Sequence, residues 1–479
     1  MLKNQRILLS LVLKQSLIIS VITFQGCQTS KKPLATRIAE PIPVAWFHGV
    51  KSRQLASDVV DDSEMTDQQK DQFKNHFKNL NSEQRNAIIA KAEIFKKKPS
   101  VDEISQVDVI ENLKRKCSDR PDFNYGVRQE SSGVSVGEGM AYEFAGKSNS
   151  KTYYEWPSVT CQYKPDHELT GQSSKFKCDV QLKGEKTKTV KFKYASDEKN
   201  PTDSEVIETI IATEASHLMG FAAETYCPVR VTCEGCPSSN PWQNARSSAP
   251  AVSQGSAQFE YALIEVKQKG YEVALAGVES DKPQGLAWEE LRFANPKDPA
   301  VKEKLIDREV WMLWASFLRY ADADPHNQKI ICDKAKVDVQ GNPVCEHSVV
   351  YTHDYGKSIA HMYFNLWAVD VLERKDGKCI GTLDRPKILG VAVGGQVGTG
   401  IIVRPSISEE ARQIFLARIE KITDKQWTDI FMLAQVEREG VTKNNLKEWL
   451  ESIHNKIRNI RKTSCPAFDT YQSVLGQKR

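Results

Sequence analysis

Two short segments hold the residues whose types and spacing are suited to chemistry, and they read FLRYADADPHNQKIICD at 317–333 and SVVYTHDYGKSIAHM at 348–362. In the first, Asp322 precedes Asn327 by five residues; in the second, Asp354 opens an Asp-Tyr-Gly triplet after an apolar run. Phosphoryl transfer needs a carboxylate near the attacking hydroxyl, with an amide oxygen and a second carboxylate to hold magnesium against the ATP phosphates. The spacing supplies all three groups.

The same residues fit plainer interpretations, which the sequence leaves open. Asp, Asn and Pro are favoured in turns, so Asp322 and Asn327 could belong to a turn after a helix, and Asp354 to a turn that ends a strand. Histidines also gather around these loops, which keeps a transition-metal site with Asp322 or Asp354 as an alternative; they are His326, His347, His353 and His361. No HxxxH or HExxH pattern supports that alternative.

A lysine on an upstream strand is the second part of a phosphate-transfer apparatus. The strand-like run VKFKY offers Lys191 and Lys193, which point to the same face because they are two residues apart. We favour Lys193 from its position before the following helix. A glutamate of that helix would orient the lysine on the ATP phosphates, and Glu208 is our candidate with Glu205 as the open alternative.

The order and spacing of these residues resemble those of the protein-kinase-like superfamily. Its catalytic loop has Asp and Asn five positions apart, followed by Asp-Phe-Gly after a hairpin; here Tyr320 and Ala321 stand where His-Arg is customary. The segment GQSSKF resembles the short Gly-x-x-x-Lys phosphate loop of HipA-like kinases, with Gly171, Gln172, Ser173 and Lys175 as its members. Over about residues 155–460, the chain is similar to HipA-like and CotH-like atypical kinases.

This resemblance implies an α+β, bilobal, kinase-like fold with a small antiparallel N-lobe and a mainly helical C-lobe. It implies Asp322 as the base or hydroxyl-orienting carboxylate, Asn327 and Asp354 as ligands of Mg²⁺ or Mn²⁺, and Lys193 on the phosphates of ATP. The loop residues Gly171, Gln172, Ser173 and Lys175 would contact phosphate oxygens through amides and a hydroxyl. The acceptor, whether protein, lipid or sugar, is not specified by spacing.

Local patterns divide the chain into five segments. We expect a leader at 1–26, a tether at 27–60, a helical extension at 61–150, an N-lobe with a cysteine-rich insertion at 151–270 and a helical C-lobe at 271–479. Two-residue alternation at 153–194 predicts antiparallel strands, and 204–219 returns to helical spacing. In the apolar helix DREVWMLWASFL, the face of Trp311, Trp314 and Phe317 is expected in the core. Capping boxes at Ser406/Glu409 and Thr423/Gln426 predict two later helix starts.

The first residues are typical of an export signal. Lys3, Arg6 and Lys14 precede or interrupt an apolar stretch that ends near Gly26 and Cys27, and the Gly-Cys pair resembles a bacterial lipobox. We expect Cys27 to carry a lipid that anchors the protein to the cell envelope, with the outer membrane favoured by Gln28. Secretion without a lipid and an uncleaved anchor are the alternatives. Removal of the leader leaves 63 basic against 62 acidic residues, so nucleic acid is not an expected partner.

The cysteines agree with an oxidising compartment. Eleven are present, and ten remain after Cys27, enough for five disulfides. Cys332 and Cys345 flank a polar turn that returns one strand alongside another, so they form the favoured bridge. Cys227, Cys233 and Cys236 are disulfide candidates, with zinc as the alternative because Cys233 and Cys236 have zinc-ligand spacing.

Export conflicts with the expected chemistry, since ATP is scarce outside the cytoplasm. Three classes of function follow: an active Mg-ATP-dependent phosphotransferase, an inactive kinase-fold binding module, and a structural envelope lipoprotein. The presence of both candidate metal ligands favours the active enzyme, because an inactive site has no physical need for them.

Overall fold

The computed structural model contains both helices and strands, which confirms the α+β class. It describes residues 67–95, 101–117, 125–131, 150–165, 174–181, 187–195, 205–236, 255–266, 270–273, 297–320, 327–338, 342–356, 358, 370–382, 387–388, 391–392, 406–438 and 445–470. These residues belong to one compact unit. The predicted leader, lipidation residue Cys27 and tether lie outside the described residues. Within the described residues, helices that combine the length and apolarity needed to cross a membrane are absent.

Four helices form the first described part of the chain: α2 (Asp67–Lys78), α3 (Ser82–Lys91), α4 (Val101–Ile104) and α5 (Val109–Lys116). Asn81 and Gln84 form a capping box at the start of α3, and Asp108 caps α5. A strand, β1 (Gly126–Ser131), follows and pairs with β2 (Ser150–Glu155). The segment 61–150, expected to be helical, therefore also contributes a β-ladder.

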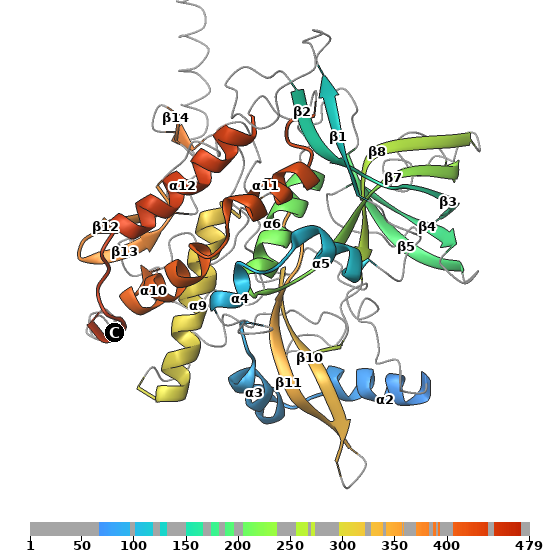
Figure 1. The fold of residues 1–479 in the computed structure, drawn as a ribbon. Helices are drawn as coiled ribbons and strands as arrows, with labels where there is room; N and C mark the ends of the chain where they lie inside the picture. Colours follow the sequence, from blue (N-terminus) through green and yellow to red (C-terminus); the bar gives the residue numbers. More distant parts are fainter. Residues whose placement is uncertain are drawn as a thin grey trace, which may run out of the picture. The chain divides into compact units, whose positions relative to one another are not determined.

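Five strands close into a barrel in the order β3-β4-β5-β8-β7. They are β3 (Ser158–Lys164), β4 (Lys175–Gln181), β5 (Thr187–Tyr194), β7 (Thr225–Cys236) and β8 (Gly255–Val266). Alternation along the strands buries one face, where Phe176 stacks on Phe192 with ring centroids 5.2 Å apart. Phe259 and Tyr194 extend this aromatic cluster. The strands and α6 (Glu205–Met219), which packs against β7 and β8, appear together in Figure 1.

A second sheet has the order β6-β11-β10-β9. Its central hairpin joins β10 (Gln328–Val337) to β11 (Pro343–Thr352), with β6 (Ala222–Ala223) and β9 (Tyr271–Glu272) outside. The long helix α9 (Pro299–Leu318) precedes the hairpin. Its Trp311 and Trp314 are buried as expected, and their indole N–H groups donate to Thr352 Oγ1 at 3.0 Å and Ser216 Oγ at 2.9 Å.

In the last third of the chain, the described residues form short strands and three helices. The strands are β12 (Leu372–Lys375), β13 (Lys378–Gly381), β14 (Lys387–Ile388), β15 (Val391–Ala392) and β16 (Ser406–Ile407). The helices are α10 (Glu409–Ile419), α11 (Asp424–Leu433) and α12 (Leu446–Lys462). The capping box of Thr423 with Gln426 is confirmed. The one predicted at Ser406 is wrong, because Ser406 lies in β16 and Ser408 caps α10.

All ten cysteines after Cys27 are paired in five disulfides. The favoured Cys332–Cys345 bridge is present and ties β10 to β11. The other pairs are Cys117–Cys227, Cys161–Cys178, Cys233–Cys236 and Cys379–Cys465. The zinc alternative for Cys227, Cys233 and Cys236 as one ligand set is wrong, because Cys227 is bonded to α5 through Cys117.

Candidate functional site

Lys193 is the lysine of β5 that joins the predicted site. Its ammonium donates to Asp354 Oδ1 at 2.8 Å and lies 4.0 Å from Glu205 Oε1. Its side chain is 6% exposed, and Nζ sits 5.2 Å from the centroid of the Tyr226 ring. Lys191 forms an ion pair with Glu265 of β8 instead. Lys193 therefore contacts Asp354, whereas Lys191 contacts Glu265, a difference that spacing alone could not give.

Helix α6 brings Glu205, the alternative to our candidate Glu208, close to this lysine. Glu205 is the first residue of α6, whereas Glu208 lies one turn further on and is fully buried. The backbone of Gly356 passes so close to Glu205 that a Cβ there would lie 2.2 Å from its Cγ. The glycine of the Asp-Tyr-Gly triplet therefore has a physical reason, since a side chain at 356 would displace the glutamate from Lys193.

The backbone of Asp354 is held in an uncommon conformation at the end of β11. Its φ of 62° lies in the left-handed region, which Asp adopts more readily than most residues. The Tyr320 hydroxyl donates to the carbonyl oxygens of His353 at 3.1 Å and Asp354 at 3.0 Å. The Asp354 N–H donates to Glu224 Oε2 at 3.0 Å. These bonds hold the backbone of Asp354, while its carboxylate contacts Lys193.

Glu224 and Tyr226 are site residues that the sequence did not reveal. Glu224 follows β6, accepts a hydrogen bond from the Tyr226 hydroxyl, and places Oε1 3.3 Å from His353 Nδ1. Burial favours the protonated carboxyl, but His353 and then Lys193 outweigh it and hold the pKa of Glu224 below its ordinary value. An isolated Glu-x-Tyr between a helix and a strand carries no signal that would have marked it.

The charges of the site are strongly coupled. Burial would raise the pKa of Asp354, yet the Lys193 ammonium lowers it to about 2, so the carboxylate is ionised. Burial opposes the charge of Lys193, but Asp354 and Glu205 hold the pKa of that lysine above its ordinary range. Lys175 lies opposite Lys193 in the β4–β5 ladder. Burial, followed by the charges of Lys193 and Lys191, lowers the pKa of Lys175 to about 8.

The hairpin β10–β11 brings Asn327 beside the Asp-Tyr-Gly triplet. Gln328 pairs with Thr352, and the His353 N–H donates to the Asn327 carbonyl at 2.9 Å. Asn327 therefore lies opposite His353, the residue that precedes Asp354. The predicted residues Asp322, Gly171, Gln172 and Ser173 lie outside the described residues.

The histidine alternative gains no support from the described part of the chain. His347 pairs with Asp333, with Nδ1 and Oδ1 2.5 Å apart, while His353 pairs with Glu224. Neither belongs to a described group of three residues that could share a metal ion. His326 and His361 lie outside the described residues.

Comparisons with known proteins give weak similarities to kinases. No protein-family model matches the chain, and no curated protein matches it. The crystal structure of a Helicobacter pylori proinflammatory kinase, CtkA, aligns with 64% of this chain and 96% of its own, at 8% identity and a TM-score of 0.34. The FAT and kinase domain of CtTel1 aligns with 82% of this chain and 28% of its own, at 11% identity and a TM-score of 0.23. Similarities this weak carry no argument about function, which has to be based on the residues of the site.

Proposed function

We propose that this chain is a Mg-ATP-dependent phosphotransferase with a kinase-like fold, acting on a hydroxyl group of a protein, lipid or sugar. The observation that carries the proposal is Lys193, a nearly buried strand lysine held by Asp354 and by Glu205 of the following helix. A lysine positioned by a helix glutamate, beside a carboxylate that follows a hairpin, is the arrangement that grips nucleotide phosphates in kinases. Joint placement of these three residues is much harder to obtain by chance than any one of them.

A second lysine lies beside Lys193, because Lys175 is opposite it across β4 and β5. Lys191 shares the same face of β5 but is paired with Glu265, so the phosphates are assigned to Lys175 and Lys193. Mutual repulsion of these lysines is relieved by a polyanion, which is consistent with the lowered pKa of Lys175. The segment Gly171-Gln172-Ser173 leads directly into Lys175, so its amides and hydroxyl would add neutral donors to the same phosphates.

Asp354 and Asn327 are suited to hold magnesium. Mg²⁺ prefers carboxylate and amide oxygens and keeps several waters, so it needs an ionised and solvent-accessible ligand. Asp354 is ionised, and 29% of its side chain is exposed, against 6% for Lys193. When bound, the metal would neutralise charge on the β- and γ-phosphates. Glu224 and Tyr320 would keep the Asp354 carboxylate in place.

Asp322 is the residue to orient the acceptor hydroxyl and take its proton. It belongs to the connection between α9 and β10, whose two ends are anchored at the site by Tyr320 and Asn327. The Tyr320 hydroxyl is hydrogen-bonded to the backbone of Asp354, and Asp322 follows Tyr320 by two residues in the sequence. This short separation supports the assignment of Asp322, which itself lies outside the described residues.

We also propose that the enzyme is exported and lipid-anchored through Cys27 in a bacterial envelope, with the outer membrane favoured. Five disulfides fit an exported protein, since such bonds persist in oxidising compartments. Cys27→Ser should release the protein from membranes. Continued membrane association of that variant would contradict lipid anchoring without touching the nucleotide proposal.

A thermal-shift titration with ATP and either Mg²⁺ or Mn²⁺ tests the nucleotide site. Ligand at a hundredfold excess over its dissociation constant stabilises the native state by about 2.7 kcal/mol. Lys193→Met should abolish the shift, whereas Lys191→Met, the matched control on the same strand face, should retain most of it. Equal shifts in both variants, or no shift for the wild-type chain at millimolar nucleotide, would overturn the proposal and favour a binding or structural role.

A further inference from the structure

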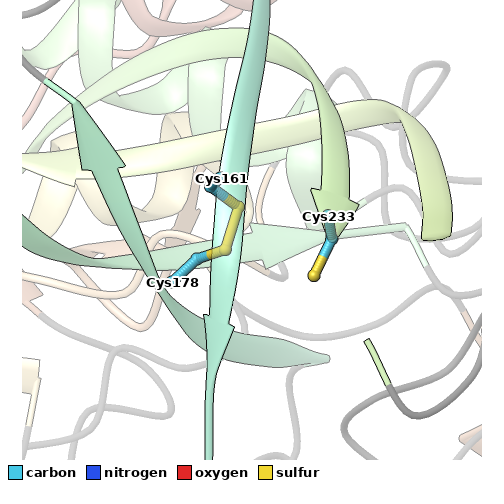
Figure 2. A group of neighbouring side chains, drawn as sticks. All are labelled: Cys161, Cys178 and Cys233. Carbon is cyan, nitrogen blue, oxygen red and sulfur yellow. A yellow bond between two sulfur atoms is a disulfide. The ribbon is translucent and has the colours of Figure 1, made fainter. Parts of the chain in front are cut away.

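Four cysteine sulfurs gather on the buried face of the barrel. The Sγ atoms of Cys161 (β3), Cys178 (β4) and Cys233 (β7) all lie within 4.8 Å of one another. Figure 2 shows these three side chains, with Cys161 and Cys178 joined by their disulfide. The fourth, Cys236, is bonded to Cys233. All four side chains are at most 3% exposed. Among the described residues, this is the one place where two disulfides meet.

Strand register explains the cluster. Cys161 pairs directly with Cys233 in the parallel β3–β7 ladder. It also pairs with Val180, which shares a face of β4 with Cys178. The sulfurs therefore come from three neighbouring strands whose positions the barrel fixes, and their proximity does not depend on the disulfides alone.

The spacing and turn at Cys233 are those of a metal-binding knuckle. Two residues separate Cys233 from Cys236, as in structural zinc sites, and Gly235 between them has a φ of +70°. Cys161 and Cys178, whose Sγ atoms lie within 4.8 Å of that of Cys233, would complete the four thiolates that a closed tetrahedral zinc site uses. Cys236 is the last residue of β7 and pairs with the exposed Gly255, so the cluster lies near the end of a strand.

We propose that Cys161, Cys178, Cys233 and Cys236 form a redox-gated zinc site, with two disulfides in oxidising surroundings and a tetrathiolate Zn²⁺ complex in reducing ones. A phosphine or dithiol reductant gives two electrons to each disulfide, and each broken S–S bond takes up two protons to yield two thiols. Zn²⁺ then displaces four protons as four Zn–S bonds form. The reductant is oxidised to a phosphine oxide or to its own disulfide.

In the oxidised chain the Cys161–Cys178 bond joins β3 to β4 and the Cys233–Cys236 bond lies within β7, whereas a zinc complex would join all three strands. Reducing compartments are also those in which disulfides are rare, so a chain held together by disulfides alone would lose these links there. Among the described residues, the other three disulfides have no third cysteine whose sulfur lies within 4.8 Å of both of their own. The same exchange for zinc is therefore not expected there. The proposal does not depend on the nucleotide site, because metal binding is measured without ATP.

Cobalt(II) titration of the full chain, reduced with a phosphine under anaerobic conditions, tests the site. We expect one Co²⁺ per chain, with thiolate charge-transfer bands and tetrahedral d–d bands, and displacement of both by Zn²⁺. The oxidised chain should give neither. Cys161→Ser/Cys178→Ser should lose the tetrathiolate spectrum, whereas Cys379→Ser/Cys465→Ser, the control that removes a distant disulfide, should keep it.

Alkylation mapping keeps the test decisive if a variant fails to fold. In the reduced, zinc-loaded wild-type chain, the four cluster cysteines should be protected from iodoacetamide at least tenfold relative to Cys379 and Cys465, and a chelator should remove the protection. Equal labelling of all ten cysteines, or cobalt spectra that are unchanged in Cys161→Ser/Cys178→Ser, would overturn the proposal.

Discussion

The two faces of the barrel strands have opposite chemistry although they share the same short segments. On β5, Lys191 and Lys193 project to one face, and Phe192 between them stacks on Phe176 on the other. On β4, Lys175 precedes Phe176 in the same way. The charged face meets Asp354 and Glu205, whereas the buried face holds aromatic rings and four sulfurs. Two-residue alternation thus places the charged side chains on one face of the barrel strands and the aromatic rings and disulfides on the other.

The largest expected effect comes from breaking the supporting face. Phe192→Ala removes a fully buried ring from the aromatic cluster and should destabilise the protein by about 3–5 kcal/mol. Chemical denaturation followed by circular dichroism measures this loss. A cost below about 1 kcal/mol would show that the barrel interior is not packed as described.

Removal of Lys193 from the charged face should reduce stability less than Phe192→Ala does, but should reduce ATP binding more. Lys193→Met leaves Asp354 and Glu205 without their shared cation, which should destabilise the fold by about 2–3 kcal/mol, less than for a fully buried pair because both carboxylates are partly exposed. Lys191→Met should cost about 1 kcal/mol or less. If the two variants proved equally stable in denaturant titrations, Lys193 would not be the buried partner of the site.

Glu224 lies between β6 and β7 and contacts the charged face through the backbone N–H of Asp354. Glu224→Gln keeps an acceptor for the Asp354 N–H but removes the charge beside His353, so we expect a loss of about 1–2 kcal/mol. Glu260→Gln, at a half-exposed position on β8, is the control and should change stability by less than about 0.5 kcal/mol. Equal unfolding midpoints for the two variants would contradict a supporting role for Glu224.

The smallest expected effect is a pH dependence of phosphate binding. Lys175, with a pKa of about 8, is charged below that pH and neutral above it, so ATP affinity should fall as pH rises from 7 to 9. Lys175→Arg stays charged throughout and should flatten that fall. Lys177→Arg, the control on the same strand, should follow the wild-type profile. An identical pH profile for wild type and Lys175→Arg would remove Lys175 from the phosphate site.

The sequence predicted what depends on local spacing. Alternation placed Lys191 and Lys193 on one face, the Thr423 capping box located the start of α11, and a turn between two strands predicted the Cys332–Cys345 bridge. Each of these features joins residues whose separation along the chain is short, so elementary periodicity describes them. The same holds for the burial of Trp311 and Trp314 on α9.

Features that depend on distant register could not be predicted. The choice of Glu205 over Glu208 follows from where α6 begins relative to Gly356, more than a hundred residues away. Glu224 enters the site because β6 pairs with β11. The Cys161–Cys178 and Cys233–Cys236 disulfides adjoin because β3 lies between β4 and β7 in the closed barrel. These features depend on contacts between segments far apart in the sequence, which local patterns do not predict.

Calorimetric titration of ATP with and without Mg²⁺, in the wild-type chain and in Asp354→Asn, tests whether Asp354 binds the metal of a nucleotide site. We expect Mg²⁺ to raise the affinity of the wild-type chain for ATP at least tenfold, or by about 1.4 kcal/mol. In Asp354→Asn this gain should vanish, while Lys193 still supports weak binding of ATP alone. A Mg²⁺ effect of the same size in a folded Asp354→Asn variant would contradict the assignment of this carboxylate to the metal and, with it, the proposed phosphotransfer site.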